Sequence, residues 1–570
     1  MARAKEGREK GEENAWYKYD KKVSSHESKG LWGGFLCITP KHCNYTKYFR
    51  QVYLFMNTFS YICALKHYRM AKTNTADIGF EDKIWKAADL LRGSIDAAEY
   101  KNVVLGLIFL KYISDCFDVK HQQLVDEGDG FEEDKDEYVS ENIFYVPADA
   151  RWSVIADAAH TPEIGKVIDN AMMEIEKEND RLKGILPKNF ARPELDKRRL
   201  GDVVDLFTNT IELGKQEENK DLLGRTYEYC LSKFASLEGK NAGEFYTPSC
   251  IVRTIVAVLQ PYKGRCYDPA MGSGGMFVQS ADFVRHHQGD IKNLSIFGQE
   301  INANTRKMAM MNLAIRGIEA DLGDRNADTF FDDRHPTLKA DFVMANPPFN
   351  MSDWGADKLQ EDVRWKYGIP PAGNANFAWL EHMISHLSPS GRIGMVLANG
   401  SLSSQSGGEG EIRKNILQAD LVEGIVALPS QLFYSTGIPV CLWFLSRQKT
   451  QPGKVVFIDA RNMGTMVTRK LRELTEDDIN RIAQTFTDYR NGTLEDEKGY
   501  CAVKTLEEVE AQDFILTPGR YVGIAEQEDD GEPFEEKMQR LTSELSGLFA
   551  ESHRLEEEIR KQLESIGFCI

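Results

Sequence analysis

The chain has 570 residues, of which 42% are apolar and 28% are charged, a composition that excludes collagen-like, largely disordered and disulfide-scaffold proteins. This length exceeds one compact core, so roughly two or three domains are expected. The 70 Lys and Arg residues against 88 Asp and Glu residues give a net charge of −18, which disfavours tight, unassisted binding to nucleic acid, because phosphate contacts require local cations.

Residues 1–69 differ from the rest of the chain. Their first 30 residues are polar and charged, and the apolar stretch at 52–65 is only 14 residues long. A membrane-spanning helix needs about 20 residues, and a signal peptide would lie nearer to the first residue. We therefore predict a leader of unknown role, added by translation from an upstream start, ahead of a functional protein that begins at Met70. A peripheral membrane segment is the alternative.

Residues 70–236 are predicted to form an all-helical domain. Apolar residues recur there at three- and four-residue spacing, which is typical of helices that bury one face. The first two such groups are Ile84, Ala88 and Leu91, and Val103, Leu107 and Leu110. An acidic, glycine-containing stretch at 126–137 interrupts the pattern, and we interpret it as a solvent-exposed loop.

From Gly243 onward, short apolar runs alternate with amphipathic segments at 302–316 and 376–387. This alternation predicts an α/β domain over 237–465, with a mostly parallel, Rossmann-like sheet covered by helices on both faces. Ligands of such sheets bind at the carboxyl ends of the strands. The runs expected to be strands are Arg265 to Tyr267, Leu294 to Phe297, Asp341 to Ala345, Ile393 to Leu397, Val422 to Ala427, Val440 to Leu445 and Lys454 to Ile458.

Residues 466–570 form a C-terminal region that is predicted to end in a coiled-coil-like helix. An apolar seam repeats there at three- and four-residue spacing between charged residues. Its members are Met538, Leu541, Leu545, Leu548, Leu555, Ile559, Leu563 and Ile566. A seam of this length packs either on the body of its own chain or on a helix of a partner, and the sequence leaves both open.

A glycine-rich turn follows the first predicted strand, in the segment YDPAMGSGGMF at 267–277. Gly272, Gly274 and Gly275 let the backbone approach a ligand closely, and the start of the following helix adds exposed N–H donors. The carboxylate of Asp268, at the strand end, suits a ligand ammonium group. Such a turn by itself also occurs in many nucleotide-binding and purely structural loops.

Two further acids follow the next strands. Glu300 closes the run IFGQE, where a carboxylate can accept hydrogen bonds from both hydroxyls of a ribose. A solvent-facing Glu at a strand end is the alternative. Asp328, in the segment NADTF, is expected at the next crossover, where it could accept from an adenine amine.

The quartet Asn346-Pro347-Pro348-Phe349 ends the strand predicted at 341–345. An exocyclic base amine is a poor nucleophile because its lone pair is delocalised into the ring. The side-chain carbonyl of Asn346 and the backbone carbonyl of Pro347 can accept both amine hydrogens and draw the nitrogen towards a tetrahedral shape, so that the lone pair can attack a methyl group. The prolines fix the backbone, and Phe349 offers a face on which an extruded base can stack. A rigid strand-end turn with a buried Phe is the alternative.

The chain resembles the amino-methyltransferases of DNA in which the cofactor motif precedes the catalytic one. The resemblance is carried by four features in this order: the segment GEFYTP at 243–248, the glycine-rich loop, Glu300 and the quartet. The segment FEDKIWKAADLLRG at 80–93 and the segment from Asp221 to Phe234 are more closely similar to the modification subunits of type I restriction enzymes. The similarity covers roughly residues 80–458 and leaves residues 1–69 unmatched.

The resemblance implies S-adenosylmethionine as the cofactor and the exocyclic amine of adenine in DNA as the methyl acceptor. It assigns Glu300 to the cofactor ribose and 346–349 to the catalytic site. The residues that it places around the methionine part are Glu244, Phe245, Tyr246, Thr247, Pro248 and Ser249, and the loop 268–275 with Asp268, Gly272, Ser273, Gly274 and Gly275.

The partners implied by the resemblance are DNA, one specificity subunit for two modification subunits, and restriction subunits for cleavage. Length and charge agree, because only 112 residues follow the last predicted strand at Ile458, which leaves little room for a base-reading domain. The chain also lacks a GxxxxGK[ST] loop, so cleavage driven by a nucleotide would belong to another subunit.

Ten cysteines are spread singly from Cys37 to Cys569, without a CxxC pair or a Cys/His cluster at metal-ligand spacing. This pattern predicts reduced thiols, a cytoplasmic protein and no metal site.

Three other functions remain open from the sequence. Protein glutamine methyltransferases grip an amide with a similar Asn-Pro-Pro-aromatic site, and cytosine could replace adenine as the target base. A non-catalytic assembly scaffold is the third, which the helical domain and the terminal seam suggest. The DNA sequence recognised is not encoded in any feature of the chain.

Overall fold

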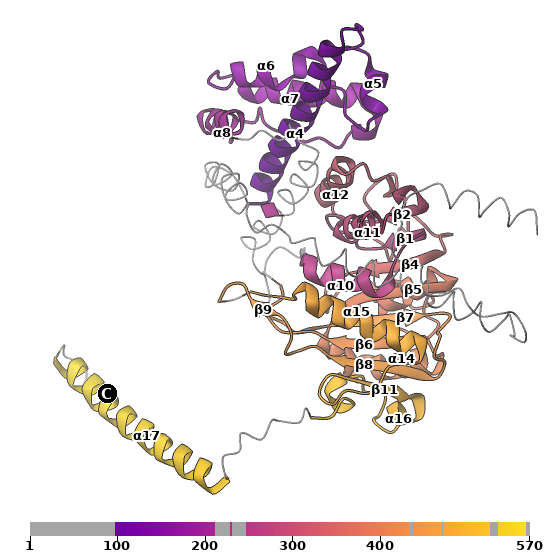
Figure 1. Cartoon of the computed structure of the whole chain (residues 1–570), viewed down its shortest axis with the longest axis vertical. Coiled ribbons are helices and arrows are strands. Elements are labelled where there is room, and N and C mark those ends of the chain that lie inside the picture. The colour runs from indigo at the N-terminus through magenta and orange to yellow at the C-terminus, as the bar shows by residue number, and fades with distance from the viewer. Residues whose placement is uncertain are drawn as a thin grey trace, which may run out of the picture. The chain divides into compact units, whose positions relative to one another are not determined.

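The computed structural model describes residues 97–210, 229–230, 247–433, 437–469, 471–524 and 534–565 (Figure 1). Outside the described residues lie the predicted leader, the helix expected around 84–91, the segment 80–93, all of the segment 221–234 except 229–230, and Glu244, Phe245 and Tyr246.

Helices make up the first described region. They are α4 (Ala97–Glu127), α5 (Lys135–Val139), α6 (Trp152–Asp157), α7 (Ile164–Glu178) and α8 (Lys197–Thr210). Val103, Leu107 and Leu110 of α4 are fully buried in their common core, which confirms the second predicted helix. The acidic loop is shorter than expected, because α4 continues to Glu127 and α5 begins at Lys135.

A sheet of nine strands follows in the described part of the chain. The strands are β1 (Gly264–Asp268), β2 (Leu294–Gly298), β3 (Ala320–Asp321), β4 (Ala340–Ala345), β5 (Leu387–Ala398), β6 (Val422–Ala427), β7 (Val440–Ser446), β8 (Lys454–Asp459) and β11 (Cys501–Thr505). Their order is β11-β8-β6-β7-β5-β4-β1-β2-β3. Strand β7 is antiparallel to β5 and β6, β11 is antiparallel to β8, and the other neighbours are parallel. All seven predicted runs lie in strands of this sheet.

Two strands of this sheet were not predicted. Strand β3 has only two residues, too few for an apolar run, and β11 lies at an edge of the sheet with its last three residues only partly buried. Because β11 pairs with β8, the sheet extends beyond the boundary predicted at residue 465. A separate antiparallel pair consists of β9 (Thr465–Met466) and β10 (Arg472–Glu473).

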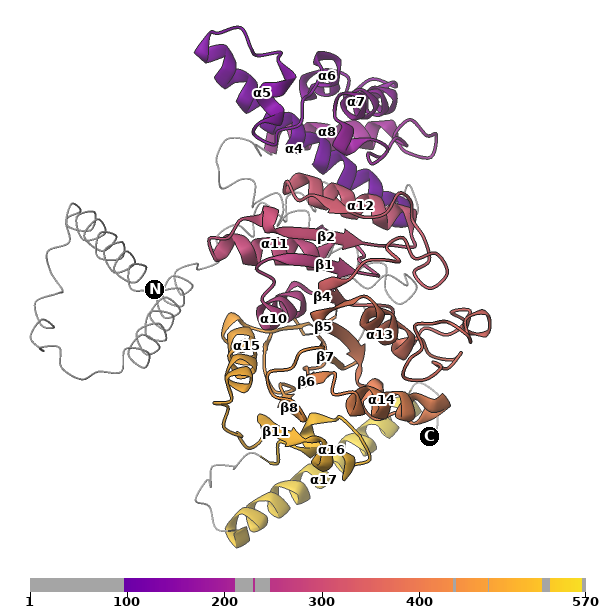
Figure 2. The ribbon, with the colours of Figure 1, turned by 90° about the vertical axis from the view of Figure 1, so that its right-hand side faces the viewer.

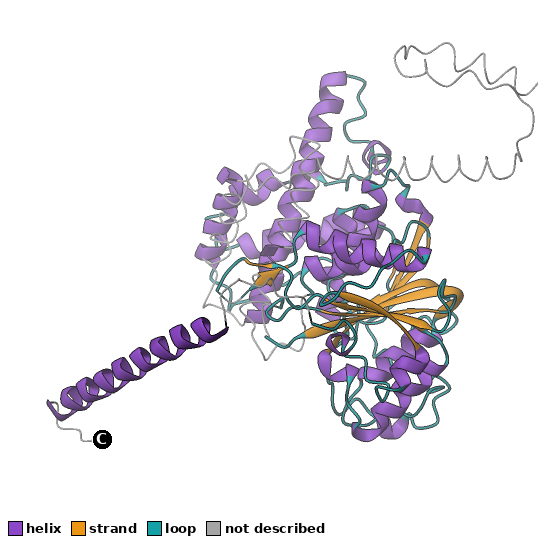
Figure 3. Cartoon of the chain, turned by 60° about the horizontal axis from the view of Figure 1, so that its bottom comes forward, coloured by secondary structure: helices purple, strands orange, loops and turns teal. Residues whose placement is uncertain are grey.

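Helices cover both faces of the sheet (Figures 2 and 3). One face packs against α10 (Ser249–Leu259), α11 (Gly275–His286), α12 (Ala303–Ile315) and α15 (Glu476–Asn491). The other packs against α13 (Asn376–Ser385), α14 (Glu409–Gln418) and α16 (Leu506–Glu510). Side chains alternate between the two cores, as a pleated strand requires: Cys266 of β1 joins the first and Tyr267 the second. This confirms the predicted α/β fold with a preceding helical region.

The last described helix is α17 (Phe534–Ser565). Leu541, Leu545, Leu548 and Ile559 of its predicted seam are 43 to 62% exposed. Within the described ranges, no helix combines the length and the apolarity needed to cross a bilayer.

Candidate active site

Three predicted site residues lie at the carboxyl ends of neighbouring strands. Asp268 ends β1, Glu300 comes two residues after β2, and Asn346 directly follows β4. The chain leaves β1 towards β2 and β3 on one side and returns to β4 on the other side. The strand order therefore reverses between β1 and β4, and ligands of open α/β sheets bind at such a switch point.

The glycine-rich loop joins β1 to α11. Gly272 and Gly274 have φ values of 54° and 79°, in the left-handed region that favours glycine. A Cβ atom on Gly272 or Gly275 would meet no atom within 4 Å, so the backbone there borders open space. The Ser273 carbonyl accepts a bond of 2.8 Å from Asn312 Nδ2, which ties the loop to α12. The loop therefore offers a backbone surface that a ligand can approach.

Asp268 is almost completely buried, with 2% of its surface exposed. Its Oδ1 accepts a bond of 3.0 Å from the Ala270 amide. Burial, reinforced by the charge of Glu300 and only partly opposed by that bond, raises the pKa of Asp268 to about 8. A buried carboxylate of this kind is stabilised by a ligand cation, because the cation removes the penalty for its charge.

Glu300 connects the end of β2 to the glycine-rich loop. Its Oε2 accepts a hydrogen bond of 3.1 Å from the Gly272 amide, and its Oε1 accepts one of 2.9 Å from the Asn302 amide. Each carboxylate oxygen can accept two hydrogen bonds, so these contacts are compatible with additional bonds from ribose hydroxyls. The side chain is 8% exposed, which excludes the alternative of a freely solvated Glu.

Asp328 lies beside Glu300. The Glu300 carbonyl accepts a bond of 3.0 Å from the Ala327 amide, and Asp328 Oδ1 accepts 2.9 Å from the Phe330 amide. The buried Gln299, which the sequence analysis missed, holds this segment, because its Nε2 donates to the Ala327 carbonyl at 3.2 Å. The structure therefore brings Asp268, Glu300 and Asp328 to one edge of the sheet.

Asn346 is held by a residue that is distant in the sequence. Its Nδ2 donates to the Thr247 hydroxyl at 2.9 Å, just before α10, so Thr247 contacts the catalytic quartet. The Oδ1 atom of Asn346 is buried and has no hydrogen-bond partner among the described residues. Of the other residues assigned from GEFYTP onward, Pro248 is buried and Ser249 is exposed at the start of α10.

The turn after the quartet is fixed by α13. Asn350 has a φ of 51°, which Asn tolerates better than most residues. Its amide donates to Asn376 Oδ1 at 3.0 Å, and its Oδ1 accepts from Asn376 Nδ2 at 2.9 Å. Asn376, at the first position of α13, is 1% exposed. This reciprocal pair orients Phe349 and the prolines before it.

Phe349 is partly buried and meets a second aromatic ring. The rings of Phe349 and Phe433 are 5.7 Å apart at 86°. Phe433 lies in the loop between β6 and β7, and no motif in the sequence marked it. The structure thus adds an aromatic residue from a remote loop to the quartet.

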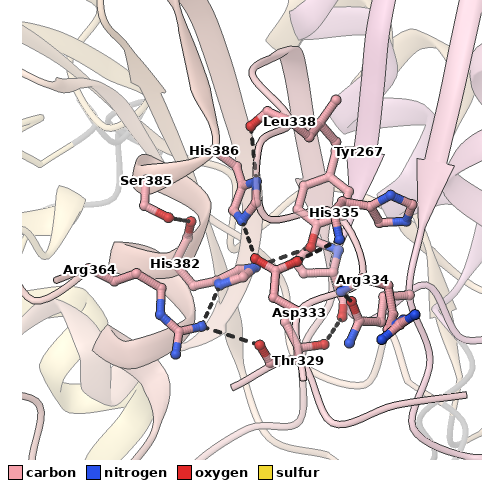
Figure 4. A network of polar contacts seen from close by, with 12 residues as sticks. Tyr267, Thr329, Asp333, Arg334, His335, Leu338, Arg364, His382, Ser385 and His386 are labelled. Carbon is pink, nitrogen blue, oxygen red and sulfur yellow. Dashed lines mark hydrogen bonds and ion pairs between the residues drawn. The ribbon is translucent and has the colours of Figure 1, made fainter. Parts of the chain in front are cut away.

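A polar cluster lies behind the ends of β1 and β2 (Figure 4). Asp333, His382 and His386 offer ligand atoms within 4.8 Å of one another, although the sequence predicted no metal site. Asp333 Oδ2 and His386 Nε2 are 2.9 Å apart. Burial alone would raise the pKa of Asp333, but the hydrogen bond and charge of His386 lower it to about 2.

The hydrogen bonds of His382 disfavour a metal ion in this cluster. Arg364 Nη1 donates to His382 Nδ1 at 3.0 Å, and His382 Nε2 lies 3.1 Å from the Tyr267 hydroxyl. Burial, with the charges of His386 and Arg364, holds the pKa of His382 well below its usual range, so the ring is neutral and Nε2 carries the proton. Neither nitrogen then presents a lone pair to a metal, and Arg364 would repel a cation.

The chain matches the family model of N-6 DNA methylases over residues 218–530 and that of the HsdM N-terminal domain over residues 80–207. It is 51% identical over 447 residues to the type I restriction enzyme HindI methylase subunit of Haemophilus influenzae, which covers 74% of this chain and 100% of that protein. It is 40% identical over 516 residues to the type I restriction enzyme MjaIX methylase subunit of Methanocaldococcus jannaschii, and this match covers 86% of this chain and 92% of that protein. A solved type I methyltransferase subunit from Streptococcus thermophilus superimposes with a TM-score of 0.67 at 25% identity, over 78% of this chain and 99% of that one.

Proposed function

The chain belongs to the N-6 DNA methylases and, within them, to the methylase subunits of type I restriction enzymes, and on this premise we propose that it transfers a methyl group from S-adenosylmethionine to the exocyclic amine of adenine in DNA. The observation that carries the proposal is the buried Oδ1 atom of Asn346, which has no hydrogen-bond partner in the described part of the chain. A buried acceptor left unpaired costs about 1–3 kcal/mol. A substrate amine that donates to this atom removes that penalty.

The catalytic step needs two acceptors and no strong base. Asn346 Oδ1 and the carbonyl of Pro347 accept the two hydrogens of the target amine, and this pairing shifts the nitrogen towards a tetrahedral shape. Thr247 holds the carboxamide by its Nδ2, which leaves Oδ1 for the substrate. S-adenosylmethionine would supply an electrophilic methyl group on a sulfonium centre: as the amine nitrogen bonds to that carbon, the carbon–sulfur bond breaks with its electron pair left on sulfur, and the surplus amine proton passes to water.

The cofactor is proposed to bind at the carboxyl ends of β1 and β2. Asp268 pairs with the ammonium of its methionine part, Glu300 accepts from the ribose hydroxyls, and Asp328 accepts from its adenine amine. The open backbone at Gly272 and Gly275 supports this placement, since a Cβ there meets no atom within 4 Å. Glu244, Phe245 and Tyr246 complete the set by resemblance.

The target base must leave the duplex to reach Asn346, because its amine is otherwise paired. Phe349 offers it a stacking face. The buried ring of Phe433, at 86° to that of Phe349, packs against Phe349 from another loop and supports its position.

Other subunits are proposed to supply DNA recognition and cleavage. The net charge of −18 makes a partner that contributes cations necessary for tight binding to DNA. The exposed seam of α17 is a surface on which a helix of another subunit can pack. We propose two copies of this chain with one specificity subunit, joined by restriction subunits, in the cytoplasm.

The test is methyl transfer from tritiated S-adenosylmethionine by this chain with its specificity subunit, followed by nucleoside analysis. Label in N6-methyladenine supports the proposal, whereas label in a cytosine product or in protein glutamine refutes it. Asn346→Ala should lower the rate about 100-fold or more, as loss of one preorganised polar group does elsewhere, without loss of cofactor binding. Asn293→Ala, an exposed residue at the opposite edge of the sheet, is the matched control. An unchanged rate of methyl transfer in Asn346→Ala would favour the alternative that the chain is a non-catalytic assembly scaffold.

A further inference from the structure

Arg364 lies in the segment between the catalytic quartet and α13, and its side chain is only 12% exposed. All five N–H donors of its guanidinium have acceptors. Nε and Nη2 donate to the two carboxylate oxygens of Asp362, at 2.8 and 2.6 Å. Nη1 donates to His382 Nδ1 at 3.0 Å and to the Thr329 carbonyl at 3.2 Å (Figure 4). Nη2 also donates to the Phe330 carbonyl at 2.6 Å.

The two backbone carbonyls that Arg364 binds belong to the residues directly after Asp328. The Asp328 carboxylate in turn accepts from the Phe330 amide. The Thr329 hydroxyl donates to the Pro269 carbonyl at 2.6 Å, next to Asp268. One largely buried side chain therefore holds the backbone that links two of the proposed cofactor carboxylates.

We infer that Arg364 is a positioning residue of the cofactor site: it holds the Asp328 carboxylate where the adenine part of the cofactor would bind. Cofactor affinity then depends on the segment that follows the catalytic quartet, because Arg364 belongs to that segment. The inference rests on the proposed function, because it takes S-adenosylmethionine as the ligand. Arg364 does not touch the reacting atoms in this arrangement and acts through 328–330.

Only an arginine can make these contacts. A lysine has one nitrogen and three donors and cannot reach two carbonyls, a carboxylate and an imidazole in one plane. Asp362 supplies the opposite charge that a largely buried guanidinium requires, and Arg364 Cζ lies 5.2 Å from the centroid of the Trp365 ring, within the range of a cation–π contact. His382 is neutral, which lets its Nδ1 accept.

The experiment measures S-adenosylmethionine binding to the full chain by calorimetry, for Arg364→Met, Arg364→Lys and the control Arg325→Met. Arg325 lies three residues before Asp328, but it is 59% exposed and pairs with Asp332. We expect the Kd to rise about tenfold or more in Arg364→Met, somewhat less in Arg364→Lys, and by less than about twofold in the control. At saturating cofactor, kcat should fall by less than about threefold, and the KM for DNA should not change. A merely structural role would not raise the Kd for the cofactor while leaving kcat and the KM for DNA nearly unchanged.

A double-mutant cycle with Asp328→Asn tests the route. If Arg364 acts through Asp328, Arg364→Met should weaken binding much less in the Asp328→Asn background than in the wild type. Additive losses, or an unchanged Kd in Arg364→Met, would overturn the inference. If Arg364→Met does not fold, Arg364→Lys carries the same cycle. A wild-type chain that binds no S-adenosylmethionine would instead refute the proposed function.

Discussion

The hydrogen bond between Thr247 and Asn346 gives the sharpest test of how the quartet works. Thr247→Val keeps the side-chain volume but removes the hydroxyl that accepts Asn346 Nδ2 at 2.9 Å. Without it the carboxamide can rotate and present its NH2 group to the substrate amine, which repels it. A hydrogen bond of this kind contributes about 0.5–1.5 kcal/mol, which corresponds to roughly a 2- to 13-fold change in population.

We therefore expect Thr247→Val to lower the rate of methyl transfer about 2- to 13-fold with no change in cofactor Kd. The assay is single-turnover transfer to DNA at saturating S-adenosylmethionine, in the complex with the specificity subunit. Thr247→Ser retains the hydroxyl and should stay within about twofold of the wild type. In the Asn346→Ala background, Thr247→Val should have no further effect. A wild-type rate in Thr247→Val, or a loss that appears only in cofactor Kd, would refute this reasoning and return Thr247 to the cofactor site alone.

Three other predictions concern the cofactor loop and the turn after the quartet. The pKa of Asp268 is about 8 in the free protein and should be lower beside a bound cation, so binding releases a proton below pH 8. Affinity for S-adenosylmethionine measured by calorimetry should therefore rise about tenfold per unit from pH 6 to near pH 8 and then level off, and a pH-independent affinity would contradict this. Glu300→Gln leaves one side-chain oxygen in place of two, so the amide of Gly272 or Asn302 loses its acceptor. We expect the free energy of unfolding, measured in urea, to fall by about 1–3 kcal/mol and the Kd for the cofactor to rise. If neither value changes, Glu300 does not have the assigned role. Asn376→Ala removes both bonds to the turn, and we expect a lower kcat with cofactor Kd within about twofold, whereas a wild-type kcat would mean that the turn keeps its shape unaided.

The sequence by itself determined the strands and the order of the chemical groups along them. The apolar runs at 265–267, 341–345 and 422–427 all became strands, because a strand buried on both faces needs a local apolar run. Asp268 and Asn346 follow such runs directly, and Glu300 comes two residues after β2. Parallel strands present their carboxyl ends at one edge, so this local pattern was sufficient to predict that Asp268, Glu300 and Asn346 gather there.

Only the tertiary structure decided which groups touch. Thr247 reaches Asn346 across 99 positions in the sequence, and Phe433 meets Phe349 from a loop between β6 and β7. Arg364 looks like an ordinary charged loop residue in the sequence, yet its side chain is only 12% exposed. Contacts of this kind depend on strand order and on loop paths, which arise from packing over the whole core and leave no periodic signal in the neighbouring residues.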